Sequence, residues 1–196
     1  MSMLHIASDI LLWIGFGVMA VLVAALARQV GVLHERIAPA GALTLHQTAK
    51  PGDKAPEMLL ETLSGSTVTV GGARTGRGQL LFFLAPDCPM CKSMLPVLKS
   101  TRAAERGWLD IVLASDGEAP EHRRLVMAEG LEDFDYVLSE TLGRGLGVSK
   151  LPYAVLIGDD GRIASMGLVN TREHLESLFE AKERGVTSIQ DYLARR

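Results

Sequence analysis

The chain has 196 residues, a formal net charge of −3 and 47% hydrophobic residues. This length suits one domain with attachments, and this apolar content excludes a disordered chain. The small net charge gives no electrostatic basis for binding nucleic acid, so we expect no nucleic-acid partner.

An uncharged apolar run covers residues 10–27, near the beginning of the chain. A helix of that length nearly crosses the hydrocarbon core of a bilayer, so we predict a single transmembrane anchor over residues 1–28. A cleaved signal peptide is the main alternative, because residues 25–27 read Ala-Leu-Ala, and a buried core helix is another. The absence of Lys and Arg from residues 1–9 and the length of the run favour an uncleaved anchor.

The apolar run is followed by a stretch rich in Ala, Pro and Gly, so residues 29–54 are predicted to form a linker. Arg28 and Arg36 follow the apolar run and, by the positive-inside rule, favour a cytoplasmic position for the rest of the chain. Residues 55–184 are predicted to form one folded domain, and residues 185–196 a C-terminal tail.

Strands and helices are predicted to alternate along the folded domain. In chain order they are a strand pair at 58–63 and 66–70, a strand at 79–85, a helix at 89–106, a strand at 109–114, a helix at 121–129, a strand at 134–138, a helical turn at 142–146, a strand pair at 153–158 and 162–166, and a helix ending at 184. The continuous apolar run in 79–85 is typical of a strand buried on both faces. Asp160 and Gly161 form a hairpin signal between the last two strands.

Two helices carry further sequence signals. Leu125 and Ala128 are predicted to share the buried side of the helix at 121–129. Asn170, with Glu173 three residues later, predicts the start of the last helix, whose buried stripe is Leu175, Leu178 and Phe179. The whole order requires a parallel crossover followed by an antiparallel hairpin, which is the plan of a thioredoxin-type α/β/α sandwich.

The two cysteines of the chain, Cys88 and Cys91, form a C-x-x-C motif. Cys88 follows a predicted buried strand and begins a predicted helix, with Pro89 at the first helical position. The free N–H groups and the positive end of the helix dipole favour a thiolate there, and thiol–disulfide exchange proceeds through the thiolate. We predict Cys88 as the nucleophile and Cys91, one turn further, as the resolving thiol.

Three other interpretations of the cysteine pair are weaker. Inert core packing does not explain the spacing at a strand-to-helix junction. A structural disulfide closing so short a loop would stabilise little. A zinc site needs four ligands, whereas there is no second cysteine pair and the histidines are scattered, at His5, His34, His46, His122 and His174. We therefore predict no metal and no cofactor.

A second motif, Leu151-Pro152, precedes the strand predicted at 153–158. The combination of C-x-x-C with a strand-initiating proline about sixty residues later resembles the thioredoxin superfamily. That resemblance implies that Pro152 is cis, lies against the active-site sulfurs and helps bind the partner chain, together with Leu151, Pro89 and Met90. An ordinary trans proline opening an edge strand is the alternative.

The chain departs from the thioredoxin pattern at two positions. Asp87 stands before the first cysteine, where the superfamily often has Trp, and its carboxylate disfavours the neighbouring thiolate. Phe82 stands where thioredoxins have a buried acid that accepts the proton of the second thiol. That acceptor is missing or supplied elsewhere, with Glu61 and Lys92 as candidates.

A closer resemblance extends over essentially the whole chain. It is carried by the apolar N-terminal run and by residues 51–70, 80–100, 147–161 and 167–193. These segments resemble the MauD family of methylamine utilisation accessory proteins, and residues 167–193 are the most specific part. In that family the protein is associated with production of methylamine dehydrogenase, whose β subunit is small, dense in disulfides and carries a tryptophan-derived quinone.

The resemblance implies a substrate and a location. The chain is expected to form, reduce or isomerise disulfides in the methylamine dehydrogenase β subunit, with a redox partner whose identity the sequence does not reveal. Disulfides persist in the periplasm, so we expect an inner-membrane protein with its catalytic domain there, against the weak opposite bias of Arg28 and Arg36.

Three rival functions fit the sequence less well than thiol–disulfide exchange. A peroxidase of the peroxiredoxin class needs a hydroxyl residue three positions before its cysteine, where Ala85 stands relative to Cys88. A copper(I)-delivery protein of similar fold needs a histidine near the thiols, for which His174 is the late candidate. A maturation scaffold that holds its partner without catalysis is the third alternative.

Overall fold

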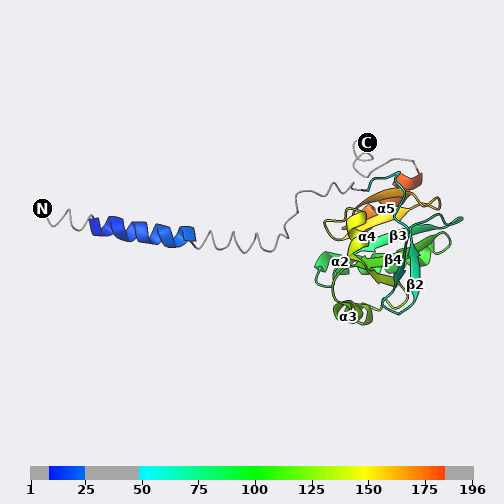
Figure 1. Ribbon diagram of the computed structural model, residues 1–196, viewed down its shortest axis with the longest axis horizontal. Coiled ribbons are helices and arrows are strands. Elements are labelled where there is room, and N and C mark those ends of the chain that lie inside the picture. The colour runs from blue at the N-terminus through cyan, green and yellow to red at the C-terminus, as the bar shows by residue number, and fades with distance from the viewer. Residues whose placement is uncertain (1–8, 25–48, 184–196) are drawn as a thin grey trace. The chain divides into compact units, whose positions relative to one another are not determined.

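The computed structural model describes residues 9–24 and 49–183, which belong to two separate compact units (Figure 1). Residues 9–24 are helical, with their side chains exposed and the rings of Trp13 and Phe16 meeting edge-on. No helix within the described residues has both the length and the apolar character needed to span a bilayer. The remainder of the predicted anchor, most of the linker with Arg28 and Arg36, and the C-terminal tail lie outside the described residues.

A five-stranded sheet forms the centre of the domain, in the order β5-β4-β3-β6-β7. Its strands are β3 (Gly78–Phe83), β4 (Leu109–Ser115), β5 (Asp135–Leu138), β6 (Tyr153–Ile157) and β7 (Ile163–Leu168). The first three strands run parallel to one another, whereas β6 is antiparallel to both β3 and β7. The predicted parallel crossover and antiparallel hairpin are therefore confirmed.

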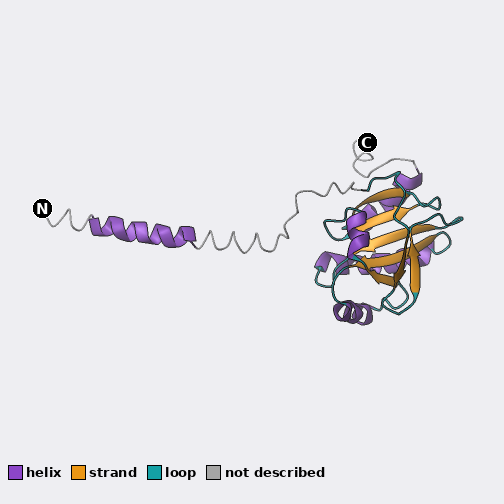
Figure 2. Cartoon of the chain, viewed as in Figure 1, coloured by secondary structure: helices purple, strands orange, loops and turns teal. Residues whose placement is uncertain are grey.

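Layers of helix cover both faces of this sheet (Figure 2). The helices are α2 (Pro89–Glu105), α3 (Ala119–Glu129), α4 (Glu140–Gly145) and α5 (Arg172–Glu183), and a separate antiparallel pair is formed by β1 (Met58–Glu61) and β2 (Thr67–Val70). One core cluster joins the sheet to α2, α3 and α5. The other core cluster joins the opposite face to α4 and to the β1–β2 pair.

Strand β3 shows why the apolar run predicted a doubly buried strand. Its successive side chains point to opposite faces, so Leu80 and Phe82 enter the cluster with α2, while Leu81 and Phe83 enter the cluster with α4. All four side chains are buried. This central strand leads directly into the loop before Cys88, so the candidate site rests on the most buried element of the domain.

The β6–β7 hairpin turns at the predicted glycine. Gly161 has a φ of 76°, and a Cβ added there would lie 2.7 Å from the backbone carbon of Gly72. Only glycine meets both the left-handed conformation and this close approach of another loop. The turn residues Asp160 and Gly161 are therefore confirmed for both a local and a tertiary reason.

Two details of the helices differ from the sequence prediction. Thr171, and not Asn170, caps α5, because its hydroxyl accepts from the backbone N–H of His174 at 3.3 Å. In α3 Leu125 is buried as predicted, but Ala128 is exposed. The buried face of α3 instead includes His122, which lies one helical turn before Leu125.

Candidate active site

Cys88 lies at the junction between β3 and α2, as predicted. It is the N-cap residue of α2 in an extended conformation, with Pro89 in the first turn. Its sulfur accepts a hydrogen bond from the backbone N–H of Cys91 at 3.2 Å. A helix N-terminus has N–H groups without intrahelical partners, so a sulfur at this position receives a donor that also supports negative charge.

The two thiols are free and differ in exposure. Cys88 is partly exposed, whereas Cys91 is completely buried on the inner side of α2. Burial raises the pKa of the Cys91 thiol to about 12, and its hydrogen bond with Cys88 and the charges of Cys88 and Asp87 add to the rise. Cys91 is therefore a thiol at neutral pH, while Cys88 is the sulfur that solvent and a partner protein can reach.

Pro152 comes to the same edge of the sheet because of strand register. Tyr153, the first residue of β6, pairs with Phe83, the last residue of β3, so both chains enter or leave the sheet at this edge. The Leu151–Pro152 peptide bond is cis, as the thioredoxin resemblance implied. The carbonyl of Pro152 accepts from the backbone N–H of Val169 at 3.1 Å, which fixes this turn against the end of β7.

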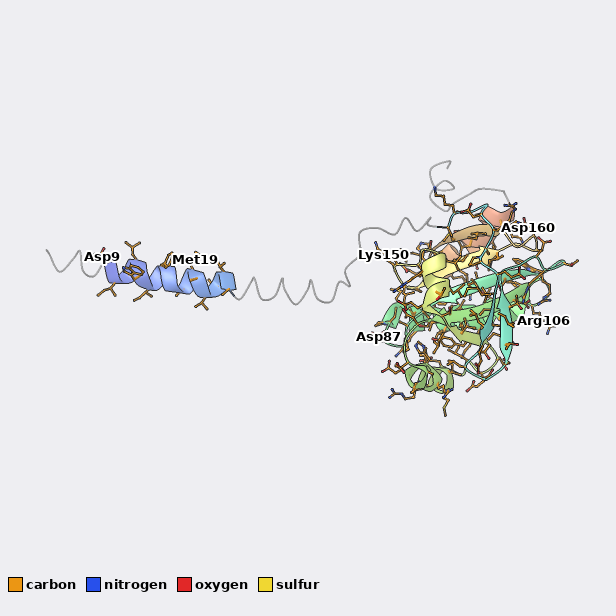
Figure 3. The ribbon with its side chains drawn as sticks, in the orientation of Figure 1. Asp9, Met19, Asp87, Arg106, Lys150 and Asp160 are labelled. Carbon is orange, nitrogen blue, oxygen red and sulfur yellow. The ribbon has the colours of Figure 1, made fainter. Side chains whose placement is uncertain are left out.

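Exposed apolar side chains surround this edge. Met90 is 46% exposed, Leu151 is 38% exposed and Leu168, which pairs with Tyr153, is 41% exposed. A cavity of about 310 Å³ opens beside Leu151, with Leu84 and Ser115 also in its lining. Figure 3 shows Asp87 and Lys150, which precede the cysteine and proline motifs, on one side of the domain, and Arg106, beyond the other end of α2, on the opposite side.

A buried polar cluster that sequence reasoning missed lies below this edge. His122 of α3 and Tyr136 of β5 are each 2% exposed, and Nδ1 of His122 lies 2.7 Å from the Tyr136 hydroxyl oxygen. Ser115 donates to the carbonyl of Leu84 at 2.6 Å. The signal for His122 was its position one helical turn before Leu125, since residues three apart share a helix face.

The sequence candidates for a proton acceptor have side chains in contact with solvent. Glu61 and Lys92 both have exposed side chains, and Phe82 is buried in the apolar core. Asp87 is also exposed, and its charge contributes to the raised pKa of Cys91. Within the described residues, no cluster of three or more His, Cys, Asp or Glu side chains is arranged to hold a metal ion.

Comparisons with known proteins agree with this geometry. The Redoxin family profile matches residues 50–182. The chain is 45% identical to the methylamine utilization protein MauD of Paracoccus denitrificans, over 100% of this chain and 98% of that protein. It is 43% identical to MauD of Methylophilus methylotrophus, over 96% of this chain and 89% of that protein.

A solved structure described as the thiol:disulfide interchange protein DsbE of Chlorobium tepidum has the same fold, with a TM-score of 0.61 and 22% identity, over 68% of this chain and 98% of that one. The sheet order, the cysteine pair at the start of α2 and the Redoxin match together define a thioredoxin-like protein. Within that class, the chain belongs to the MauD family of methylamine utilisation proteins.

Proposed function

We propose that this protein is a membrane-anchored thiol–disulfide oxidoreductase that acts on the disulfides of the methylamine dehydrogenase β subunit. The observation that carries the chemistry is the pairing of a reachable sulfur with a buried one. The sulfur of Cys88 caps α2 and accepts from the N–H of Cys91 at 3.2 Å, while Cys91 is fully buried behind it.

This arrangement supports two successive exchange steps. The Cys88 thiolate attacks one sulfur of a substrate disulfide, forms a mixed disulfide and releases the other substrate sulfur as a thiolate. Cys91 then loses its proton and attacks Cys88, so the protein is oxidised to the Cys88–Cys91 disulfide and the substrate is fully reduced. The reverse sequence oxidises a substrate dithiol, and incomplete cycles rearrange disulfides.

The exposed apolar side chains supply a surface for the partner chain. Met90 and Leu151 flank the two motifs, and Pro89 lies exposed between Cys88 and Met90. An extended substrate segment has unpaired backbone groups and apolar side chains. The end of the sheet lies open to its backbone, and the cavity beside Leu151 can receive an apolar side chain. We assign substrate contact to the exposed Leu151, Pro89 and Met90 and to the turn at Pro152, whose own side chain is buried.

The membrane anchor rests on the apolar N-terminal segment. Residues 10–27 carry no charge, and the part of this run that the structure describes is helical with its apolar side chains exposed. An alkaline phosphatase fusion after residue 54 tests both anchor and orientation, since the fused enzyme is active only in the periplasm. We expect an active fusion in the membrane fraction. An inactive alkaline phosphatase fusion, together with an active fusion of a cytoplasmic reporter at the same residue, would contradict the periplasmic assignment.

The substrate is tested by trapping it. In Cys91→Ser the second step is blocked, so the Cys88 mixed disulfide should accumulate during production of methylamine dehydrogenase. We expect the β subunit in the trapped complex by mass spectrometry, and none with Cys88→Ser or with the double variant as matched controls. Methylamine dehydrogenase that matures normally in cells carrying only Cys88→Ser would contradict the proposal.

A further inference from the structure

The cavity beside Leu151 is walled by the two segments that carry the active-site motifs. Its volume is about 310 Å³, and its lining comes from the ends of β3 and β4, from α4 and from the loop before Pro152. Leu84, in this lining, precedes Ala85, whose carbonyl accepts from the backbone N–H of Cys88 at 3.2 Å. Leu151, also in the lining, precedes the cis bond to Pro152. A partner chain bound at the cysteine pair therefore has this cavity within reach of its side chains.

The large apolar residues of the lining determine what the cavity can hold. They are Phe83, Leu84, Val148 and Leu151. The hydroxyl of Ser115, also in the lining, donates to the Leu84 carbonyl at 2.6 Å, so it is not free to select a polar ligand. An apolar cavity of roughly 150 Å³ binds benzene, so the larger volume here has room for an aromatic ring and for the atoms that join it to a backbone.

The charged residues of the lining do not favour a charged ligand. All of them are exposed, and they comprise two acids and two bases: Asp116, Glu140, Arg144 and Lys150. Arg144 and Glu140 form an ion pair with each other. The two bases favour an aromatic ring over an aliphatic chain, since a cation is attracted to the face of a ring.

Gly143 of α4 leaves the ring of Phe83 open to the cavity. Both residues line the cavity, and a Cβ added at Gly143 would meet Cε1 of Phe83 at 3.8 Å, an ordinary van der Waals distance. The φ of Gly143 is not in the left-handed region, and a helical position of this kind is more stable with most other residues than with glycine. The backbone therefore does not require glycine here, and the effect of Gly143 is to leave the edge of the Phe83 ring accessible.

We propose that this cavity is a specificity pocket for an aromatic side chain of the substrate protein, kept open by Gly143. This inference rests on the proposed exchange activity and names the chemistry that the site selects. The aromatic ring enters beside Leu151 and meets the edge of the Phe83 ring, in the edge-to-face arrangement that aromatic pairs favour. The bound ring holds the neighbouring substrate disulfide at the Cys88 sulfur, so mixed-disulfide formation is faster at low substrate concentration.

Peptide disulfides test the pocket directly. Each probe is a seven-residue peptide of glycine and serine with a central cysteine, which forms a disulfide with 2-nitro-5-thiobenzoate. When Cys88 attacks the peptide sulfur, a disulfide forms between Cys88 and the peptide, and the coloured thionitrobenzoate leaves as a thiolate. The set places tryptophan, leucine, glutamate or alanine at each position within three residues of the cysteine. Release is timed at low and saturating peptide with the reduced full chain in detergent.

The variants change the size of the pocket without touching the cysteines. Gly143→Leu extends a side chain over Phe83 and fills the pocket, and Gly143→Ala adds one methyl group. Gly145→Leu is the matched control, because Gly145 is an exposed residue of the same helix, lies outside the cavity lining and has open space around an added Cβ. Folding of each variant is compared with the wild type by circular dichroism.

In the wild type we expect the tryptophan peptide to react about tenfold faster than the alanine peptide at one or more positions, through a lower half-saturating concentration. Leucine should lie between them, and glutamate should react no faster than alanine. Gly143→Leu should bring the ratio of tryptophan to alanine rates to about one, because the pocket is filled. Gly143→Ala should reduce the ratio in part, and Gly145→Leu should keep it.

Two results would overturn the inference and leave the proposed function standing. One is a leucine or glutamate peptide that reacts as fast as the tryptophan peptide at every position. The other is a tryptophan preference that survives in Gly143→Leu or, if that variant does not fold, is unchanged in Gly143→Ala. Absence of release from every peptide by the wild type would overturn both the inference and the proposed function.

Discussion

The ionisable groups at the two ends of the parallel strands differ in their exposure to solvent and in the direction of their pKa shifts. At the amino end, Asp110 of β4 binds Arg74 at 2.9 Å and Arg77, and the hydrogen bond from Arg77 lowers the pKa of Asp110. Asp110 is 37% exposed, so these charges are paired within reach of solvent. At the carboxyl end, Cys91 is buried and its pKa is raised.

The contrast separates a structural site from a reactive one. An exposed ion pair of fixed charge contributes modest stability and has no proton to move near neutral pH. A buried group whose charged form is disfavoured ionises only when a reaction beside it changes its surroundings. Removing a group from the carboxyl end should therefore alter reactivity, whereas removing one from the amino end should alter stability.

The largest effect is expected at Cys88. Cys88→Ser should abolish turnover of insulin or of a scrambled disulfide substrate, because the remaining thiol, Cys91, is buried and out of reach of a partner. Cys91→Ser should also lose turnover but keep a single round of mixed-disulfide formation. Turnover is followed by insulin turbidity and mixed disulfides by mass spectrometry. Residual turnover in Cys88→Ser would disprove its assignment as nucleophile.

The second effect concerns the pH dependence of Cys91. With a pKa raised to about 12, its thiolate fraction at pH 8 is about 10⁻⁴ and grows tenfold for each further pH unit. Iodoacetamide should therefore modify Cys88 first and Cys91 only in strongly alkaline solution. In Cys88→Ala the alkylation of Cys91 should begin at lower pH, because the contributions of Cys88 to the raised pKa are removed while burial remains. Rapid modification of Cys91 at neutral pH would contradict this geometry.

A smaller effect is expected from the exposed apolar side chains. Leu151→Ser should raise KM for a protein substrate about tenfold, since part of an apolar side chain no longer packs against the partner. Its reaction with a small disulfide reagent should be unchanged. Leu59→Ser, at an exposed leucine of the separate β1–β2 pair, is the matched control and should leave KM as in the wild type. Equal effects of the two variants would argue against a partner surface at Leu151.

The smallest effect is expected at the amino end of the sheet. Asp110→Asn should lower the free energy of unfolding by roughly 1 kcal/mol at pH 7 without changing exchange rates. Because the pKa of Asp110 is depressed in the folded state, this stability is present above its unfolded value near 4 and lost as pH falls through the folded value. Urea unfolding at pH 7 and pH 2 should therefore show a difference between variant and wild type that disappears in acid. Asp133→Asn, whose ion pair with Arg102 is long and exposed, should change stability less.

The fold and the cysteine site were predictable because their signals are local. The apolar run of β3, the Asp160-Gly161 turn and the Cys88-Pro89 helix start each depend on residues adjacent in sequence. The cap of α5 was predicted one residue early, at Asn170, because Asn and Thr are both good caps and only the backbone path selects Thr171.

The proton acceptor of the buried thiol has no local signal of this kind. Glu61 and Lys92 carry titratable side chains, but both side chains are exposed to solvent. His122 and Tyr136 are 14 residues apart and on different elements, and no sequence period links them. Helical spacing alone placed His122 on the face of Leu125, and nothing in the sequence placed Tyr136 beneath it.

The sequence by itself determined the class of chemistry, because a reactive cysteine pair at a helix start is a short-range feature of neighbouring residues. The tertiary structure decided which sulfur is buried, how the Pro152 turn comes to the sheet edge where β3 ends, and which polar groups are buried around His122. Those properties depend on strand register and on the packing of α2 and α3 against β4 and β5, where contacts join residues that are distant along the chain.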